Sequence, residues 1–259
     1  MPRIAKVNYH VHKDERQAFH IDAGGVIGKL ISPELVATPI QVKDVRCGEV
    51  AVSFNADSVV FAQTPTRVLS FTNGEDWQAT YDQELTGLLT RELGAKEVVV
   101  FDHTVRIDDP NSDRKPARNV HSDYSVDGAH QRLIDILGED CAREWSEGHY
   151  GFINVWRPVG DAINSAPLGF VRPDSVAEDD WIMLDLIYPD RLGHIMGLAA
   201  SEKHQWVYQS RMSPDDVAIF NIYDNRGRPS IAHSAMDLAE DETINIIRKS
   251  IESRTLVRY

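Results

Sequence analysis

Two side chains near the middle of the chain could bind one metal ion. His121 and Asp123 lie two residues apart, within the stretch 118–125. On a β-strand, residues i and i+2 point to the same face, so both side chains can reach a single cation. An imidazole and a carboxylate, together with one histidine from elsewhere, form the facial triad that holds Fe(II) and leaves positions open for other ligands. The spacing therefore predicts a metal site, provided that the chain supplies a third ligand.

The His-x-Asp tripeptide is a weak signal, because this chain contains it three times. His12 with Asp14 and the tripeptide 20–22 match as well as His121 with Asp123. Position separates them, since a double-stranded barrel places its last ligand on a late strand, several strands after the first two ligands. The first two tripeptides precede the predicted barrel, so we expect the third to bind metal.

The third ligand is to be chosen among His194, His204 and His233. We predict His233, which follows several strand-like runs and precedes one closing strand. Further on, Arg248 could pair with the far carboxylate of a 2-oxo acid through its planar fork, and Ser250 shares its strand face.

A rival arrangement starts from His204. It is followed by Arg211 and Ser213, which repeat the Arg-x-Ser pattern. Residues 212–216 are typical of a turn that opens on the next strand, and this choice would leave the end of the chain outside the barrel. The ordered set of His-x-Asp, His233 and a late Arg-x-Ser is the better fit to one site.

Most of the secondary structure that must position these residues is predicted to be β-strand, because the sequence consists largely of short apolar runs separated by Pro and Gly. We predict strands over residues 50–54, 58–62, 96–106, 151–157, 167–171, 181–187, 206–209, 217–223 and 250–259. A turn is predicted at 72–74, and helices from about residue 75 to Leu93, where Gly94 is a C-cap, and from about Gly128 to Leu137.

The expected fold class is α+β, mainly β: a double-stranded β-helix of jelly-roll, cupin-like type with helices packed on one sheet. We expect a single domain over 1–259, in which 1–95 supplies strands and helices that flank the barrel and 96–259 forms its core.

The composition limits the partners. The 259 residues carry a formal net charge of −13, which argues against nucleic acid and against an anionic membrane surface as partners. Two cysteines make no disulfide framework, and no long apolar segment occurs, so we expect a cytoplasmic protein. The sequence leaves the oligomeric state open.

The chain resembles the CmcJ/AsaB-like group of Fe(II)/2-oxoglutarate-dependent oxygenases, which includes a cephamycin 7α-methoxylation component and fungal hydroxylase/desaturase proteins. The similarity runs from about residue 50 onward. The stretches that carry it are 101–103 with Arg106, 120–125 with Gly128 and Ala129, 153–158, 185–191, Trp206 with Tyr208 and Met212, 214–216, 233–235 and 248–254. Asn-Val-Trp-Arg-Pro and Asp-Leu-Ile-Tyr-Pro-Asp-Arg are a specific combination.

The resemblance implies that His121, Asp123 and His233 hold iron and that Arg248 and Ser250 anchor 2-oxoglutarate. It also implies an enzyme that uses O2 to oxidise a C–H bond of a small specialised metabolite, amino-acid-derived ones included, with succinate and CO2 as coproducts. Hydroxylation, desaturation and oxidative cyclisation all use this triad, and the sequence does not separate them. The family tends to carry a threonine and an aromatic residue after its distal histidine, where residues 234–236 are Ser-Ala-Met.

Six further residues are candidates for the pocket, and each also has a structural interpretation. Asn154 could face the cosubstrate or be a hydrogen-bonded amide of the barrel wall. Arg157 could bind an anionic substrate or form a structural ion pair. The remaining candidates for contact with substrate are Tyr124 and Ser125, which follow the metal ligands directly, and Trp206 and Tyr208, which share a strand face and are equally typical of a core.

Two other functions were weighed. The first is a metal-binding barrel without O2 activation, such as an isomerase, a hydrolase or a binding module. In such a protein, mutation of Arg248 would leave the activity unchanged. The second is nucleotide or S-adenosylmethionine binding by the glycine-rich stretch 23–28. That stretch lacks a convincing preceding strand and an acidic residue at the ribose distance, so an ordinary turn is the better interpretation.

Overall fold

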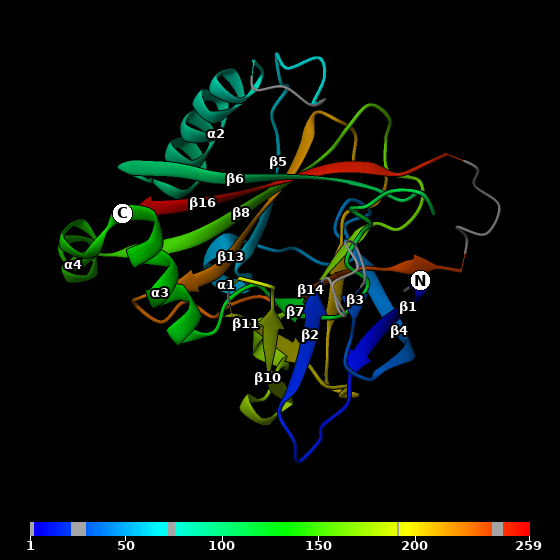
Figure 1. Ribbon diagram of the computed structural model, residues 1–259. Helices are drawn as coiled ribbons and strands as arrows, with labels where there is room; N and C mark the ends of the chain where they lie inside the picture. Colours follow the sequence, from blue (N-terminus) through cyan, green and yellow to red (C-terminus); the bar gives the residue numbers. More distant parts are fainter. Residues whose placement is uncertain (1–2, 22–29, 72–75, 191, 240–245) are drawn as a thin grey trace.

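Two β-sheets lie face to face and make a double-stranded β-helix (Figure 1). The computed structural model describes residues 3–21, 30–71, 76–190, 192–239 and 246–259. Within these ranges, the larger sheet has the strand order β15-β1-β4-β12-β9-β14-β7-β11-β10-β2-β3, and the smaller one β5-β13-β8-β16-β6. The predicted fold class is confirmed.

The larger sheet consists of β1 (Arg3–His10), β2 (Gln17–Ile21), β3 (Leu30–Ile31), β4 (Leu35–Asp44), β7 (His121–Ser122), β9 (Leu168–Val171), β10 (Trp181–Ile187), β11 (Leu192–Leu198), β12 (Trp206–Tyr208), β14 (His233–Ala235) and β15 (Asp237–Leu238). The smaller sheet consists of β5 (Val59–Gln63), β6 (Glu97–Ile107), β8 (Tyr150–Pro158), β13 (Asp216–Asp224) and β16 (Lys249–Arg258). The α-helices are α1 (Phe54–Asp57), α2 (Gln78–Leu93), α3 (Val126–Leu137) and α4 (Glu139–Glu147), and two 3-10 turns cover Pro173–Ser175 and Glu178–Asp180.

The central strands β8 and β13 of the smaller sheet are buried on both faces, and most of their residues are apolar. Along β8, Phe152 and Trp156 point into the barrel, whereas Ile153 and Val155 point to the opposite, outer face. All nine residues of β8 are buried.

Helix α2 covers the outer face of the smaller sheet, as Figure 1 shows. Its leucines at positions 85, 88 and 89 are buried against the sheet, as helical spacing of apolar residues requires. Gly94 ends the helix with φ 71°, a left-handed conformation that glycine adopts without steric cost. The predicted helix and its C-cap are confirmed.

Several local predictions differ from the structure. The predicted strand 50–54 is absent: Ser53 instead caps α1, and its Oγ accepts a hydrogen bond from the Ala56 amide. Helix α4, whose Ala142 and Trp145 pack into the barrel core, was not predicted from the sequence. Both α1 and α4 are short, with four and nine residues, and helices of this length depend on tertiary packing for their stability.

Part of the N-terminal segment joins the barrel sheets rather than only flanking them. Strand β1 pairs with β4, β4 pairs with β12 in parallel, and β5 pairs with β13 of the smaller sheet. The predicted turn 72–74 and the glycine-rich stretch 23–28 lie outside the described residues.

Candidate metal centre

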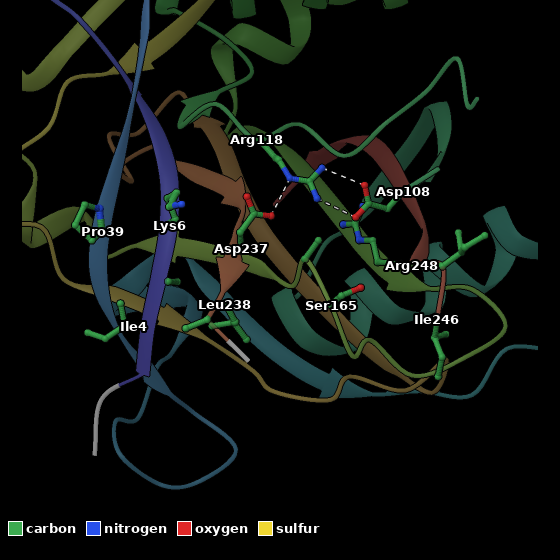
Figure 2. A pocket seen from close by; sticks show the side chains of 14 residues that line it. Ile4, Lys6, Pro39, Asp108, Arg118, Ser165, Asp237, Leu238, Ile246 and Arg248 are labelled. Atoms are coloured by element: carbon green, nitrogen blue, oxygen red, sulfur yellow. Dashed lines mark hydrogen bonds and ion pairs between the residues drawn. The ribbon is translucent and has the colours of Figure 1, made fainter. Parts of the chain in front are cut away.

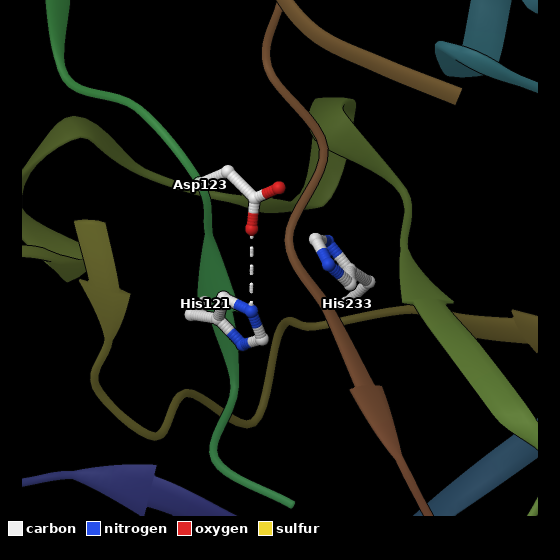
Figure 3. A group of neighbouring side chains, drawn as sticks. All are labelled: His121, Asp123 and His233. Carbon is white, nitrogen blue, oxygen red and sulfur yellow. Dashed lines mark ion pairs between the residues drawn. The ribbon is translucent and has the colours of Figure 1, made fainter. Parts of the chain in front are cut away.

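Three potential metal ligands converge inside the barrel (Figure 3). One ligand atom from each of His121, Asp123 and His233 lies within 4.8 Å of the others. The two imidazole centroids are 4.5 Å apart, and Nε2 of His121 is 3.5 Å from an Asp123 carboxylate oxygen. Ligand atoms this close need only small side-chain movements to surround one cation at distances of about 2 Å.

Strand pairing brings the two histidines together although they are far apart in the sequence. Strand β14 lies between β9 and β7, and His233 is directly opposite His121 in the register. Cross-strand partners point to the same face of a sheet, so both imidazoles enter the barrel. Asp123 follows β7 immediately, in the short connection that leads to α3. The predicted third ligand, His233, is therefore the candidate that the fold places beside the other two.

Backbone carbonyls orient both imidazoles. Nδ1 of His121 lies 2.8 Å from the Asn119 carbonyl oxygen, and Nδ1 of His233 lies 3.3 Å from that of Ile231. Each Nδ1–H donates to a carbonyl, which leaves each Nε2 lone pair free for a cation. Burial, together with the neighbouring His121, lowers the pKa of His233 to about 4, so this imidazole is neutral at neutral pH.

The two oxygens of Asp123 have different surroundings. Oδ2 accepts hydrogen bonds from Asn154 Nδ2 at 2.8 Å and from Arg254 Nε at 3.1 Å, whereas Oδ1 faces His121. Burial is the largest single influence and raises the pKa of this carboxyl, but the positive charge of Arg254 and the two neighbouring histidines together outweigh it and hold the pKa well below its usual value. Asp123 is therefore an anion, with one oxygen directed at the imidazoles.

A buried guanidinium deeper in the barrel, that of Arg248, forms no ion pair with any residue that the structure describes. Arg248 is 4% exposed, and its Nε and Nη1 have no hydrogen-bond partner among the described residues. The Oγ of the fully buried Ser250 is also without a partner there. The Arg248 guanidinium lies 5.3 Å from the centroid of the Trp156 ring, and burial lowers its pKa to about 9. These orphaned donors fit the carboxylate of a 2-oxo diacid.

A cavity of about 670 Å³ adjoins Arg248 (Figure 2). In its wall, Arg118 bridges two carboxylates, with 2.9 Å ion pairs to Asp108 and to Asp237. No triad residue lines this cavity, so it lies at the Arg248 end of the site and not at the metal ligands.

The structure corrects the prediction for Arg157. This side chain is on the outer face of β8 and is 1% exposed. Its guanidinium donates to the carbonyl oxygens of Thr64 and Pro214 and to the Tyr81 hydroxyl of α2. Because residues 154 and 157 have opposite parity on one strand, Arg157 cannot face the barrel interior together with Asn154.

The paired aromatics of β12 also point away from the triad. Trp206 and Tyr208 pack in the cluster behind the larger sheet, where Trp206 Nε1 donates to the Tyr9 hydroxyl. The residue between them, Val207, faces the barrel instead. Trp206 and Tyr208 are core residues and do not line the site.

The remaining candidates for the pocket are Ser125, Tyr124 and Asn154, and their surroundings differ. Ser125 caps α3, and its Oγ accepts a hydrogen bond from the Gly128 amide. Tyr124 stays close to the site: its ring is 5.1 Å from that of Phe152, and Asp123 contributes to raising its pKa to about 12, although burial is the larger cause. Asn154 contacts the carboxylate of Asp123, a partner that the sequence analysis did not predict for it.

Arg254 and its neighbour Glu252 were not predicted as site residues. A signal was available, because Ser250, Glu252 and Arg254 alternate along β16 and therefore share its inner face, and Arg248 directly precedes this strand.

Comparisons with known proteins agree with this site. The family described as "Oxidoreductase/YMDC permease-like domain" matches residues 7–258. The hydroxylase/desaturase efuI of Hormonema carpetanum is 30% identical over 85% of this chain and 83% of the relative. The alpha-ketoglutarate-dependent dioxygenase phiK of a fungal species is 27% identical, over 85% of each protein.

A solved structure has the same fold. The iron and alpha-ketoglutarate-dependent endoperoxidase NvfI superimposes with a TM-score of 0.87 over 99% of this chain and 97% of that one, at 21% sequence identity. The fold and the relatives define the class, which is that of iron- and 2-oxoglutarate-dependent oxygenases. The chain belongs to the oxidoreductase family described above, and its fungal relatives are named as hydroxylase/desaturase proteins and as a dioxygenase.

Enzymes of this class use Fe(II), 2-oxoglutarate and O2 and act on small molecules. None of the helices in the described part of the chain is long and apolar enough to span a bilayer.

Proposed function

We propose that the protein oxidises a C–H bond of a small specialised metabolite, with Fe(II) held by His121, Asp123 and His233. The observation that carries this proposal is the convergence of three ligand atoms within 4.8 Å, with both Nε2 atoms left free by the bonds at Nδ1. Three protein ligands leave open positions for a bidentate 2-oxo acid and for O2.

Arg248 and Ser250 are the proposed anchors of the far carboxylate of 2-oxoglutarate. Their buried, unpartnered donors give this carboxylate charge-assisted hydrogen bonds that water cannot supply there. Iron and 2-oxoglutarate would supply the oxidising chemistry, with succinate and CO2 as coproducts.

The protein's own contribution is orientation and the exclusion of water. The neutral His233 and the ionised Asp123 are in ligand-competent form before the metal binds, and the hydrogen bond at Nδ1 of His121 leaves its Nε2 free. The aromatic and aliphatic barrel wall keeps water away. Tyr124, beside Asp123, is the proposed substrate-contacting residue.

Within the class, we place the protein with the CmcJ/AsaB-like oxygenases, on the motifs of residues 120–125, 153–158 and 185–191. Hydroxylation, desaturation and ring closure remain alternative outcomes of the same site. The net charge of −13 supports a function without nucleic acid or anionic membrane partners.

Anaerobic titration with Fe(II) and 2-oxoglutarate tests the proposal. We expect the metal-to-ligand charge-transfer band of a chelated 2-oxo acid, and its loss in His233→Ala. His12→Ala, an exposed histidine from a rival tripeptide, is the matched control and should keep the band.

Two results would contradict the proposed function. A wild-type protein that binds no divalent metal would exclude the triad. Metal binding and turnover that do not depend on 2-oxoglutarate or on Arg248 would identify a metal-binding barrel without O2 activation.

A further inference from the structure

The guanidinium of Arg254 contacts three different carboxylates, one through each nitrogen. Nε donates to Asp123 Oδ2 at 3.1 Å, Nη1 to Asp102 Oδ2 at 2.6 Å, and Nη2 to Glu252 Oε1 at 2.6 Å. Nη1 also contacts the Thr104 hydroxyl at 3.3 Å. A planar fork with fixed donors suits such a three-way contact, which the single nitrogen of a lysine cannot reproduce.

This contact decides which Asp123 oxygen is available to a cation. Oδ2 already accepts two hydrogen bonds, from Arg254 and from Asn154 Nδ2 at 2.8 Å. Oδ1 lies on the imidazole side, 3.5 Å from Nε2 of His121. A carboxylate held in this way offers one oxygen, and rotation to offer both would break two hydrogen bonds inside the barrel.

The charges around Arg254 fit a divalent ion. A lone guanidinium beside a metal ligand would repel the ion, since like charges interact strongly where water is excluded. Asp102 and Glu252 offset that charge, and the Glu252 side chain is only 7% exposed. Three carboxylates and one guanidinium leave two negative charges, which a dication neutralises.

We propose that Arg254 is a positioning residue that, together with Asn154, restricts Asp123 to one-oxygen metal ligation and so keeps a coordination position open for the 2-oxo acid. This inference rests on the proposed function, because it assumes that the triad binds a divalent metal. It adds a role for two residues that contact the ligand Asp123.

The test is Arg254→Lys, which keeps the positive charge and removes the three guanidinium donors. Co(II) is the probe, because its d–d absorption reports coordination number. We expect the Kd for Co(II) to rise about 10–100-fold, as for other groups that orient a metal ligand. We also expect a changed d–d spectrum and weaker binding of 2-oxoglutarate to the Co(II) protein, because a freed Asp123 can occupy a second metal position.

Arg258→Lys is the matched control. Arg258 is on the same strand and pairs with Glu97 and Glu144 at the surface, so its variant should match the wild type in both Co(II) measurements. If Arg254→Lys does not fold, Asn154→Ser removes the other donor to Asp123 Oδ2 and should change the same two measurements.

The outcomes separate the two hypotheses. Wild-type protein without Co(II) binding overturns the proposed function and, with it, this inference. Normal Co(II) binding by the wild type, with an unchanged Kd and an unchanged spectrum in the folded variant, overturns the role of Arg254 alone.

Discussion

Two of the three guanidinium nitrogens of Arg248 lie in the protein interior without a hydrogen-bond partner among the described residues. A buried, unpaired charge destabilises the folded state, and we propose that a ligand in the adjoining cavity completes it. Burial also lowers the pKa of Arg248 to about 9, because it disfavours the charged form of the guanidinium. This destabilisation is present below pH 9, and therefore at neutral pH.

We therefore predict that Arg248→Met stabilises the protein in the absence of 2-oxoglutarate. A gain of about 1 kcal/mol or more would raise the Tm by at least ~2–4 °C in a domain of this size. The non-reactive analogue N-oxalylglycine, added with Co(II), should raise the Tm of the wild type but not that of the variant. Lys249→Met changes an exposed neighbour and should leave both values near those of the wild type; a Tm of Arg248→Met below the wild type would contradict the prediction.

At the scale of elements, the start of α3 fixes the position of a proposed metal ligand, Asp123. Asp123 is two residues before Ser125, whose side chain caps the helix. Helix starts need such an acceptor, because their first amides have no partner within the helix. The helix in turn packs Leu133 and Ala129 into the barrel core. The cap thus ties the ligand segment to a rigid element.

Replacement of Ser125 tests the cap. Ser125→Ala should lower the free energy of unfolding by about 1 kcal/mol, and Ser125→Asn, which also caps helices well, should lower it much less. Chemical denaturation measures both values. Equal losses in the two variants would mean that Ser125 acts in some way other than as a cap.

At the scale of the molecule, the proposed metal site joins both sheets. The imidazoles come from β7 and β14 of the larger sheet, whereas Asn154 and Arg254 hold Asp123 from β8 and β16 of the smaller one. A ligand that binds only the folded state stabilises it in proportion to RT ln(1 + [L]/Kd). Metal binding should consequently stabilise the whole barrel, and not only one loop.

We predict that Co(II) at 100 times its Kd raises the stability of the wild type by about 2.7 kcal/mol. Thermal unfolding should then shift upward by roughly 5–10 °C, and EDTA should reverse the shift. His233→Ala should show no shift at the same Co(II) concentration. A shift of equal size in that variant would place the metal elsewhere.

The sequence by itself was enough to predict the candidate metal ligands and the candidate residues that anchor the cosubstrate. The i, i+2 spacing of His121 and Asp123 and the order of strands before His233 predicted a set of ligands that the fold brings together. The same alternation predicted a shared face for Arg248 and Ser250, and both are buried with donors that have no partner among the described residues. Ligand types and strand periodicity are local properties, so they can be read without coordinates.

Only the tertiary structure decided which side-chain face of each strand faces the barrel interior. Alternation shows that Trp206 and Tyr208 share a face, but the packing of β1 and β4 makes that face the outer one. Likewise α2 covers the side of β8 that carries Arg157. The contact of Arg254 with Asp123 joins residues 131 apart in the sequence. Strand pairing and layer packing create such contacts, and no spacing along the chain reports them.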